Sequence, residues 1–203
     1  MGKYGSRVES ERDPFSQSGC PQNSLARHIY ILPFDVIDAR ILEFLRSRIM
    51  EKFQGECKIL DAVPRPDYAF NSQRKQYFST EILREMGRFT PDDARKIVGV
   101  VDVDLYVPIL TFVFGEAQLN GQRALVSLFR LHQEHYGMAP NSNLLKVRAS
   151  KEVVHELGHT FGLTHCSHRK CVMHFSHSLR NVDIKSADFC GGCSDLLSAF
   201  SSC

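Results

Sequence analysis

HELGHTFGLTH, from His155 to His165, is the most informative stretch of this 203-residue sequence. On a helix, residues four apart differ by about 40° in direction and by roughly 6 Å along the axis, so His155 and His159 can bind one metal ion together. His165 would face about 120° away if the helix continued. Gly162 offers a place for the helix to end, because glycine adopts the left-handed conformation at little steric cost. The stretch therefore predicts a helix, a break, and three histidines that converge on one ion.

This ligand set indicates catalysis. Three neutral imidazoles leave a fourth position on a zinc ion open for a water molecule, which the ion acidifies. Glu156 follows the first ligand and projects beside the ion, where it can act as general base. A lone histidine is more often a core or surface residue, but these five fixed positions arise by chance on the order of once in ten thousand such sequences. We therefore predict a catalytic zinc at His155, His159 and His165.

Four of the seven cysteines lie close together in the C-terminal fifth of the chain. Two of them form the segment FCGGC, whose glycines free backbone N–H groups to face thiolate sulfurs. Disulfides are disfavoured, because the first residues contain no apolar segment of signal-peptide length. A site of three cysteines and one of His168, His174 or His177 stays open as an alternative. We predict a closed, structural zinc site with four ligands: Cys166, Cys171, Cys190 and Cys193.

Outward from these motifs, the pattern predicts a mixed α and β chain. Residues 1–26 are polar and read as an extension outside the fold. HIYILPF, from His28, reads as a buried strand, and ECKILDAV as a second one, with an amphipathic helix between them. The run KIVGVVDVDLY predicts a strand, and Asn120-Gly121 predicts a hairpin. A long helix from Leu144 to Phe161, capped by Asn141 or Ser142, carries the histidine motif.

Two further helix starts are predicted between the second strand and the β-rich section. Ser79 or Thr80 is the expected cap of one helix. Thr90, Pro91 and Asp93 form a capping-box start for a short one.

Composition narrows the classes of partner. The formal net charge is +2 and 43% of the residues are hydrophobic, which fits one globular domain without an extended basic field. Nothing approaches the 18 or more apolar residues of a membrane span. We expect a cytoplasmic monomer that binds neither nucleic acid nor membrane.

HELGHTFGLTH, followed directly by CSHRKCVM and later by FCGGC, resembles the archaemetzincins, a family of the metzincin clan of zinc metallopeptidases. The resemblance covers roughly residues 28–193 and is strongest from Glu152 onward. It implies that Met173 supplies the Met-turn, a thioether packed beneath the catalytic zinc. It also implies two zinc ions per chain, one catalytic and one structural.

The resemblance further implies an α+β fold of α/β-like character, in which a mixed twisted β-sheet packs with long helices and a small cysteine-rich subdomain follows. Residues 27–203 then form one catalytic domain, divided into residues 27–162 and 163–203. The edge strand that borders the cleft best matches TFVFGEA, from Thr111 to Ala117. Its substrate-binding residues are expected to be Thr111, Phe112, Val113, Phe114 and Gly115.

The predicted function is hydrolysis of peptide bonds in peptide or protein substrates by a zinc-activated water, with Glu156 as general base. Two alternatives stay open. One is a zinc-stabilised peptide-binding module without turnover, which would have no use for Glu156. The other is a zinc hydrolase of non-peptide amides. His132, His135 and Tyr136 are candidates for a partner of the oxyanion, and the sequence does not decide among them.

Overall fold

A mixed five-stranded sheet forms the centre of the computed structural model, which describes residues 28–201. The expectation for residues 1–26 lies outside this range. The strands follow in the spatial order β2-β1-β5-β8-β7. The first four are parallel, and β7 pairs antiparallel with β8 at one edge. Their bounds are β1 His28–Pro33, β2 Cys57–Ile59, β5 Ala94–Val101, β7 Gly115–Ala117 and β8 Arg123–Ser127.

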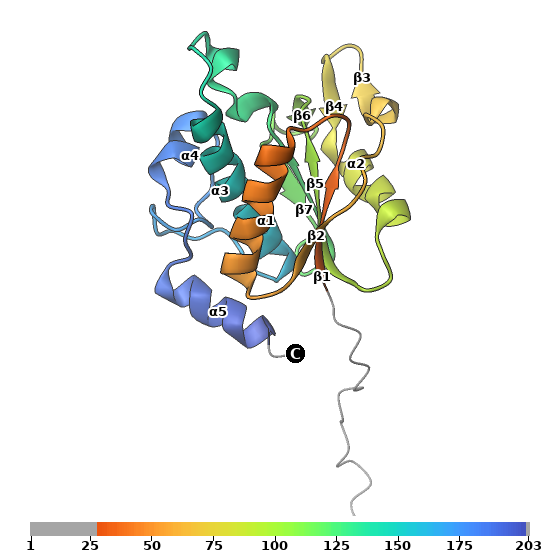
Figure 1. Ribbon diagram of the computed structural model, residues 1–203. Helices are drawn as coiled ribbons and strands as arrows, with labels where there is room; N and C mark the ends of the chain where they lie inside the picture. Colours follow the sequence, from red (N-terminus) through yellow and green to blue (C-terminus); the bar gives the residue numbers. More distant parts are fainter. Residues whose placement is uncertain (1–27, 202–203) are drawn as a thin grey trace, which may run out of the picture.

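Helices cover both faces of this sheet (Figure 1). Side chains of β1 point alternately to the two faces, as expected for a strand that is buried on both sides. Ile29 and Ile31 pack with the helices α1 and α3, whereas Tyr30 and Leu32 pack with α2 on the other face. The α-helices are α1 Ala39–Phe53, α2 Ser79–Glu85, α3 Ser142–Thr160, α4 Leu179–Ile184 and α5 Gly191–Ser201.

Short elements complete the fold. A second, three-stranded sheet has the order β3-β4-β6. Its strands are β3 Phe70–Asn71, β4 Gln76–Phe78 and β6 Leu105–Tyr106. The 3-10 helices are η1 Asp67–Ala69, η2 Met86–Phe89, η3 Phe129–Leu131 and η4 Gln133–Tyr136. No helix within residues 28–201 is long and apolar enough to cross a membrane.

The predicted mixed α and β architecture is confirmed, and so are the first strand, the hairpin and the long helix. Asn120 has φ +52°, at the turn that joins the antiparallel strands β7 and β8. Asn141 caps α3, since its side chain accepts a hydrogen bond from the Leu144 amide at 2.9 Å. Gly162, just beyond α3, has φ +89°, the left-handed conformation expected where this helix ends.

Two of the predicted caps are wrong. The short helix expected at Thr90 is absent, and the chain there turns directly into β5. The β-branched run of β5 pairs with both β1 and β8, which outweighs the local capping signal. The Thr90 hydroxyl instead donates to the Met86 carbonyl at 2.9 Å, within the preceding 3-10 helix. Ser79 begins α2, but its hydroxyl donates to the Tyr106 carbonyl at 3.0 Å rather than capping the helix.

The edge strand is shorter than expected. The segment Thr111 to Ala117 contributes only Gly115–Ala117 to the sheet. Val113 instead forms an isolated bridge with Leu105, to whose carbonyl it donates at 3.0 Å. The first half of the segment is therefore held by the smaller sheet and the second half by the larger one.

Candidate active site and metal centres

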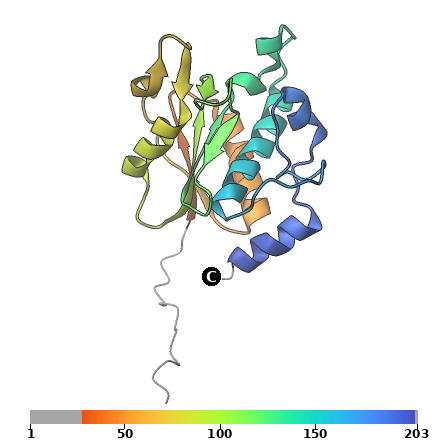
Figure 2. The ribbon, with the colours of Figure 1, turned by 180° about the vertical axis from the view of Figure 1, so that it is seen from behind.

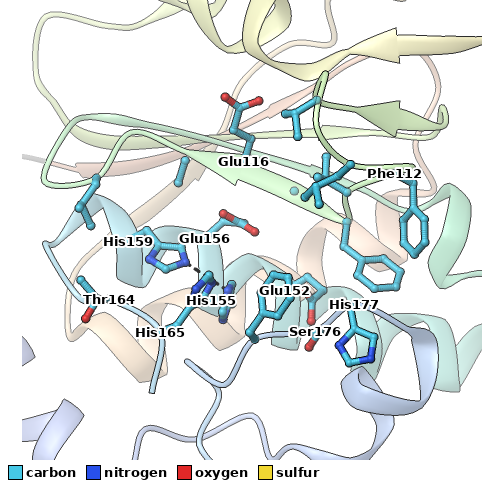
Figure 3. A pocket seen from close by; sticks show the side chains of 18 of the residues that line it. Phe112, Glu116, Glu152, His155, Glu156, His159, Thr164, His165, Ser176 and His177 are labelled. Carbon is cyan, nitrogen blue, oxygen red and sulfur yellow. Dashed lines mark hydrogen bonds between the residues drawn. The ribbon is translucent and has the colours of Figure 1, made fainter. Parts of the chain in front are cut away.

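The break after α3 brings the three histidines of HELGHTFGLTH together (Figure 3). One ring nitrogen from each of His155, His159 and His165 lies within 4.8 Å of the other two. The Nε2 atoms of His155 and His159 are 3.2 Å apart. Two zinc–nitrogen bonds of about 2.05 Å at a tetrahedral angle place their nitrogens roughly 3.3 Å apart. The donor set therefore fits a zinc ion, both in its chemistry and in its spacing.

Backbone carbonyls orient two of these rings. The His155 Nδ1 lies 2.8 Å from the Val172 carbonyl oxygen, and the His159 Nδ1 lies 2.7 Å from the Leu163 carbonyl oxygen. A carbonyl oxygen only accepts, so Nδ1 carries the proton in both rings and Nε2 keeps its lone pair. Burial also lowers the pKa of both histidines. The neutral imidazole, which is the form that binds a metal ion, is thus favoured before any ion arrives.

Glu156 lies between the histidines and strand β7, as Figure 3 shows. Its side chain lines the same cavity as the histidines and is almost fully buried. Burial raises the pKa of Glu156 well above the usual value, and the neighbouring Glu152 carboxylate raises it further. The fit against β7 depends on Gly115, where an added Cβ would lie 2.7 Å from the Glu156 Cγ and 2.6 Å from the Leu125 carbonyl oxygen.

The segment from Cys171 to His174 links the helix to the cysteine cluster. Met173 is fully buried, and a Cβ added at Gly158 would lie 2.5 Å from its sulfur. The thioether therefore packs directly against α3 on the turn between His155 and His159. The Met173 carbonyl accepts a hydrogen bond from the Cys166 amide at 2.9 Å. This is the contact expected of a methionine beneath a metal site.

The four predicted cysteines also converge, with their sulfurs within 4.8 Å of one another. The sulfurs of Cys166 and Cys190 are 3.7 Å apart, whereas a disulfide requires about 2.05 Å. Zinc–sulfur bonds of about 2.3 Å at a tetrahedral angle give a spacing of roughly 3.8 Å. The Cys190 amide donates to the Cys171 sulfur at 3.3 Å, and the His168 amide donates to the Cys166 sulfur at 3.4 Å. The cluster thus fits a four-thiolate zinc site, and none of the three nearby histidines belongs to it.

A cavity of about 510 Å³ opens at the histidines. The candidate oxyanion partners His132, His135 and Tyr136 do not line it. The cavity is lined by all five residues that were predicted to bind substrate: Thr111, Phe112, Val113, Phe114 and Gly115.

Several polar residues in the cavity wall and next to α3 were not predicted from the sequence. Glu152 and Lys185 are buried and form an ion pair with 2.9 Å between Nζ and Oε1. Arg148 is also buried and pairs with Asp183 on α4 through two contacts of 2.7 and 2.8 Å. Charged residues usually face solvent, so the sequence did not indicate that these residues would be buried. His177, named above as an alternative ligand of the cysteine site, lines the cavity instead.

Comparison with known proteins adds independent findings. The model of "Peptidase family M54" matches residues 31–199. An archaemetzincin of Methanocaldococcus jannaschii is 46% identical over 165 residues, which cover 81% of this chain and 89% of that protein. The crystal structure of archaemetzincin from Methanopyrus kandleri has a TM-score of 0.78 at 34% identity and covers 91% of this chain and all of the other. The crystal structure of the Archaeoglobus fulgidus archaemetzincin, a complex with malonate, has a TM-score of 0.72 at 38% identity, with 83% and 99% covered.

The convergent histidines, the buried glutamate beside them and these matches define the class of protein, which is a zinc metallopeptidase. The match to the family model spans most of the chain. The chain therefore belongs to peptidase family M54, the family of the archaemetzincins. The resemblance drawn from the sequence motifs is confirmed.

Proposed function

We propose that this chain cleaves peptide bonds with Glu156 as the general base, at a zinc ion held by His155, His159 and His165. The observation that carries the proposal is the position of Glu156. Its carboxylate is buried in the cavity beside three convergent imidazoles, and no hydrogen bond to a described residue occupies it. A glutamate with only a packing role would not be held in such a place without a partner.

Zinc, when bound, supplies a Lewis acid and an acidified water. With the ion in place, Glu156 would accept the proton of the attacking water on a carboxylate oxygen and would return it to the nitrogen of the leaving amine. The Val172 and Leu163 carbonyls keep the Nε2 atoms of His155 and His159 directed at the site. The chain thus provides one group that moves a proton and several that hold the geometry.

The edge of β7 is proposed to bind the substrate backbone. The Ser127 amide donates to the Phe114 carbonyl at 2.8 Å, and the Gln118 amide donates to the Arg123 carbonyl at 3.0 Å. Bonded pairs alternate along an antiparallel ladder, so Gly115 and Ala117 direct their N–H and C=O groups away from β8. An extended peptide can pair antiparallel with these groups. Val113 is excluded from this role, because its amide already donates to Leu105.

The cysteine cluster is proposed to hold a second, structural zinc, so that the chain binds two ions. Four thiolates complete the coordination of that ion and leave no position for a substrate. Its function is then to stabilise residues 163–203, which carry His165 and Met173.

Substitution of Glu156 by glutamine tests the proposal. The zinc-loaded variant should keep its zinc content and its melting temperature and lose peptide hydrolysis by at least 100-fold, because general base catalysis contributes about 10²–10⁴. Turnover of a mixed peptide library, analysed by mass spectrometry, provides the assay.

The same assay separates the alternatives. A parent protein that binds peptides without cleaving them would be a binding module. A parent that cleaves only small acyl amides would be a hydrolase of non-peptide amides. Parental turnover in the glutamine variant would disprove the assigned role of Glu156.

A further inference from the structure

Glu116, the middle residue of β7, points away from the histidines. Its partner on β8 is Leu125, which packs in the core on the α2 side of the sheet. Figure 2 shows the sheet between α2 and α3, and in Figure 3 the Glu116 carboxylate and the histidines lie on opposite sides of the strand. Glu116 nevertheless lines the active-site cavity. Its carboxylate is therefore a cavity group that the proposed chemistry does not use.

Two hydroxyl groups at the start of α2 hold this carboxylate in place. The Thr80 Oγ1 atom lies 2.9 and 3.0 Å from the two carboxylate oxygens of Glu116, and the Ser79 Oγ atom lies 2.5 Å from Oε2. The Glu116 side chain is still partly exposed. Two carboxylate oxygens have about four lone-pair sites, so these hydroxyls leave room for a further donor.

The carboxylate has no cationic partner among residues 28–201. The nearby arginines are engaged elsewhere: Arg84 pairs with glutamates of its own helix, and the Arg123 guanidinium donates to the Gln118 side chain and to the Arg84 carbonyl. Of the described residues that line the cavity, none is a lysine or an arginine. A fixed carboxylate without a counter-charge, at the edge of a sheet, favours a cation that arrives with the substrate.

The hydrogen-bond ladder determines which substrate residue meets Glu116. Gly115 and Ala117 direct their N–H and C=O groups outwards, so the peptide residues opposite them form hydrogen-bonded pairs. The peptide residue opposite Glu116 then forms a non-hydrogen-bonded pair, in which the two Cα atoms are about 4.5 Å apart and both side chains lie on the same face. This side chain therefore extends along the α2 face beside the carboxylate, whereas its two neighbours point towards α3.

We propose that Glu116 selects a basic side chain, lysine or arginine, in the substrate residue that pairs opposite it on the edge of β7. The inference rests on the proposed peptidase function. The ammonium or guanidinium donates to the Glu116 carboxylate in a charge-assisted hydrogen bond. An acidic residue at the same position would place two like charges directly opposite one another, which is destabilising. The substrates are then peptides with a basic residue at a fixed distance from the scissile bond.

The first test uses peptides with acetylated N-termini and one cleavable bond, in which each position in turn is lysine, norleucine or glutamate. Norleucine keeps the aliphatic stem of lysine without the ammonium. With the zinc-loaded chain at low salt, kcat/KM at one position should be about three-fold higher for lysine than for norleucine, and lowest for glutamate. The positions directly before and after it should show no such preference, because their side chains face α3.

Three results of this scan would overturn the proposal. One is equal kcat/KM for lysine and norleucine at every position. Another is a lysine preference at two adjacent positions, which does not follow the alternation of a strand. The third is cleavage only of peptides with a free N-terminal ammonium, which would assign the carboxylate to the end of the substrate chain.

Variants assign the preference to Glu116. Glu116→Gln keeps an oxygen for the Thr80 hydroxyl and removes the charge, so the lysine-to-norleucine ratio should fall to about one. Glu116→Lys should reverse the order, with the glutamate peptide cleaved faster than the lysine peptide. Glu81→Gln is the matched control, since Glu81 also lies in the first turn of α2 but pairs with Arg84 and does not line the cavity; it should keep the ratio. Melting temperatures show that each variant is folded.

The ratios decide the outcome. A parental ratio in Glu116→Gln refutes the proposal. An equal fall in Glu81→Gln also refutes it, because the preference would then come from the general charge of the protein.

Binding separates this inference from the peptidase function. Calorimetry with the Glu156→Gln protein, loaded with zinc, measures the affinity for the same peptides without turnover. Tighter binding of the lysine peptide, lost when Glu116→Gln is added, supports the role of Glu116 even if the parent cleaves nothing; only the proposed function then fails. Cleavage by the parent without any lysine preference leaves the function intact and refutes the role of Glu116.

Discussion

Gly115 lets the Glu156 carboxylate lie against the edge strand, and its replacement by alanine is therefore informative. An added Cβ would lie 2.6 Å from the Leu125 carbonyl oxygen, 2.7 Å from the Glu156 Cγ and 2.8 Å from its Oε1. The Leu125 oxygen belongs to the backbone of a central strand and has little freedom to move. The Glu156 side chain must therefore yield, and the contact with the Leu125 oxygen is relieved only by a small shift of strand β7 itself.

The size of the displacement follows from contact distances. Non-bonded carbons prefer separations of about 3.5 Å, so the Glu156 Cγ must retreat by about 0.8 Å from its 2.7 Å approach. A misplacement of about 1 Å costs roughly 100-fold in turnover. Overpacking costs about 1–3 kcal/mol, of which the lower chain entropy of alanine offsets up to about 1 kcal/mol. The net loss then lies between about 0 and 3 kcal/mol, and at about 2–4 °C per kcal/mol the melting temperature should fall by at most about 12 °C.

Three measurements check this prediction. Peptide turnover should fall about 100-fold, zinc content by elemental analysis should stay at the parental value, and calorimetry should show the modest loss of stability. Gly55→Ala is the control, because a Cβ there meets nothing closer than the Phe53 carbonyl oxygen at 3.7 Å. Turnover of Gly115→Ala within three-fold of the parent would refute the reasoning that Gly115 positions Glu156.

Three further predictions concern substrate pairing and the metal ions. Ala117→Pro should lower peptide turnover more than ten-fold with little change in melting temperature, because it removes an outward-facing amide and no bond to β8; parental turnover would argue against backbone pairing there. Cys193→Ser should lower the melting temperature and the soluble yield, since it removes a buried ligand of the cluster; a variant as stable as the parent would contradict a structural zinc. A chelator should remove the ion at the three histidines before the ion at the four cysteines, and elemental analysis of the zinc content over time measures this order. Simultaneous loss of both ions would contradict two separate sites.

The sequence predicts the fold where local signals and tertiary pairing agree. The buried strand β1, the turn at Asn120-Gly121 and the cap at Asn141 were all predictable, because each depends on residues within a few positions. The signal at Thr90 had the right residues for a helix start, yet β5 pairs with strands from distant parts of the chain. The local sequence does not show that these distant strands will pair. The same holds for Val113, whose partner Leu105 belongs to another sheet.

The candidate metal ligands were predictable for a similar reason. Ligand spacing within HELGHTFGLTH and within FCGGC is local, and the geometry of a helix and a glycine turn does most of the positioning. The buried ion pair of Glu152 and Lys185 was not predictable. Glu152 and Lys185 are far apart in the sequence, and only the packing of α3 against the C-terminal segment brings them together. Nothing in their local sequence indicates burial.

The segment that follows α3 links the two candidate metal sites. His165 and Cys166 are adjacent, yet one belongs to the histidine group and the other to the cysteine cluster. The Val172 carbonyl orients His155, and Met173 next to it both contacts α3 at Gly158 and bonds the Cys166 amide. A shift of this segment would therefore move three groups at once: His165, the Val172 carbonyl that orients His155, and the Met173 side chain. A metal ion at the cysteines, by fixing Cys166 and Cys171 on either side of this loop, would act on the geometry of the histidine site without touching it.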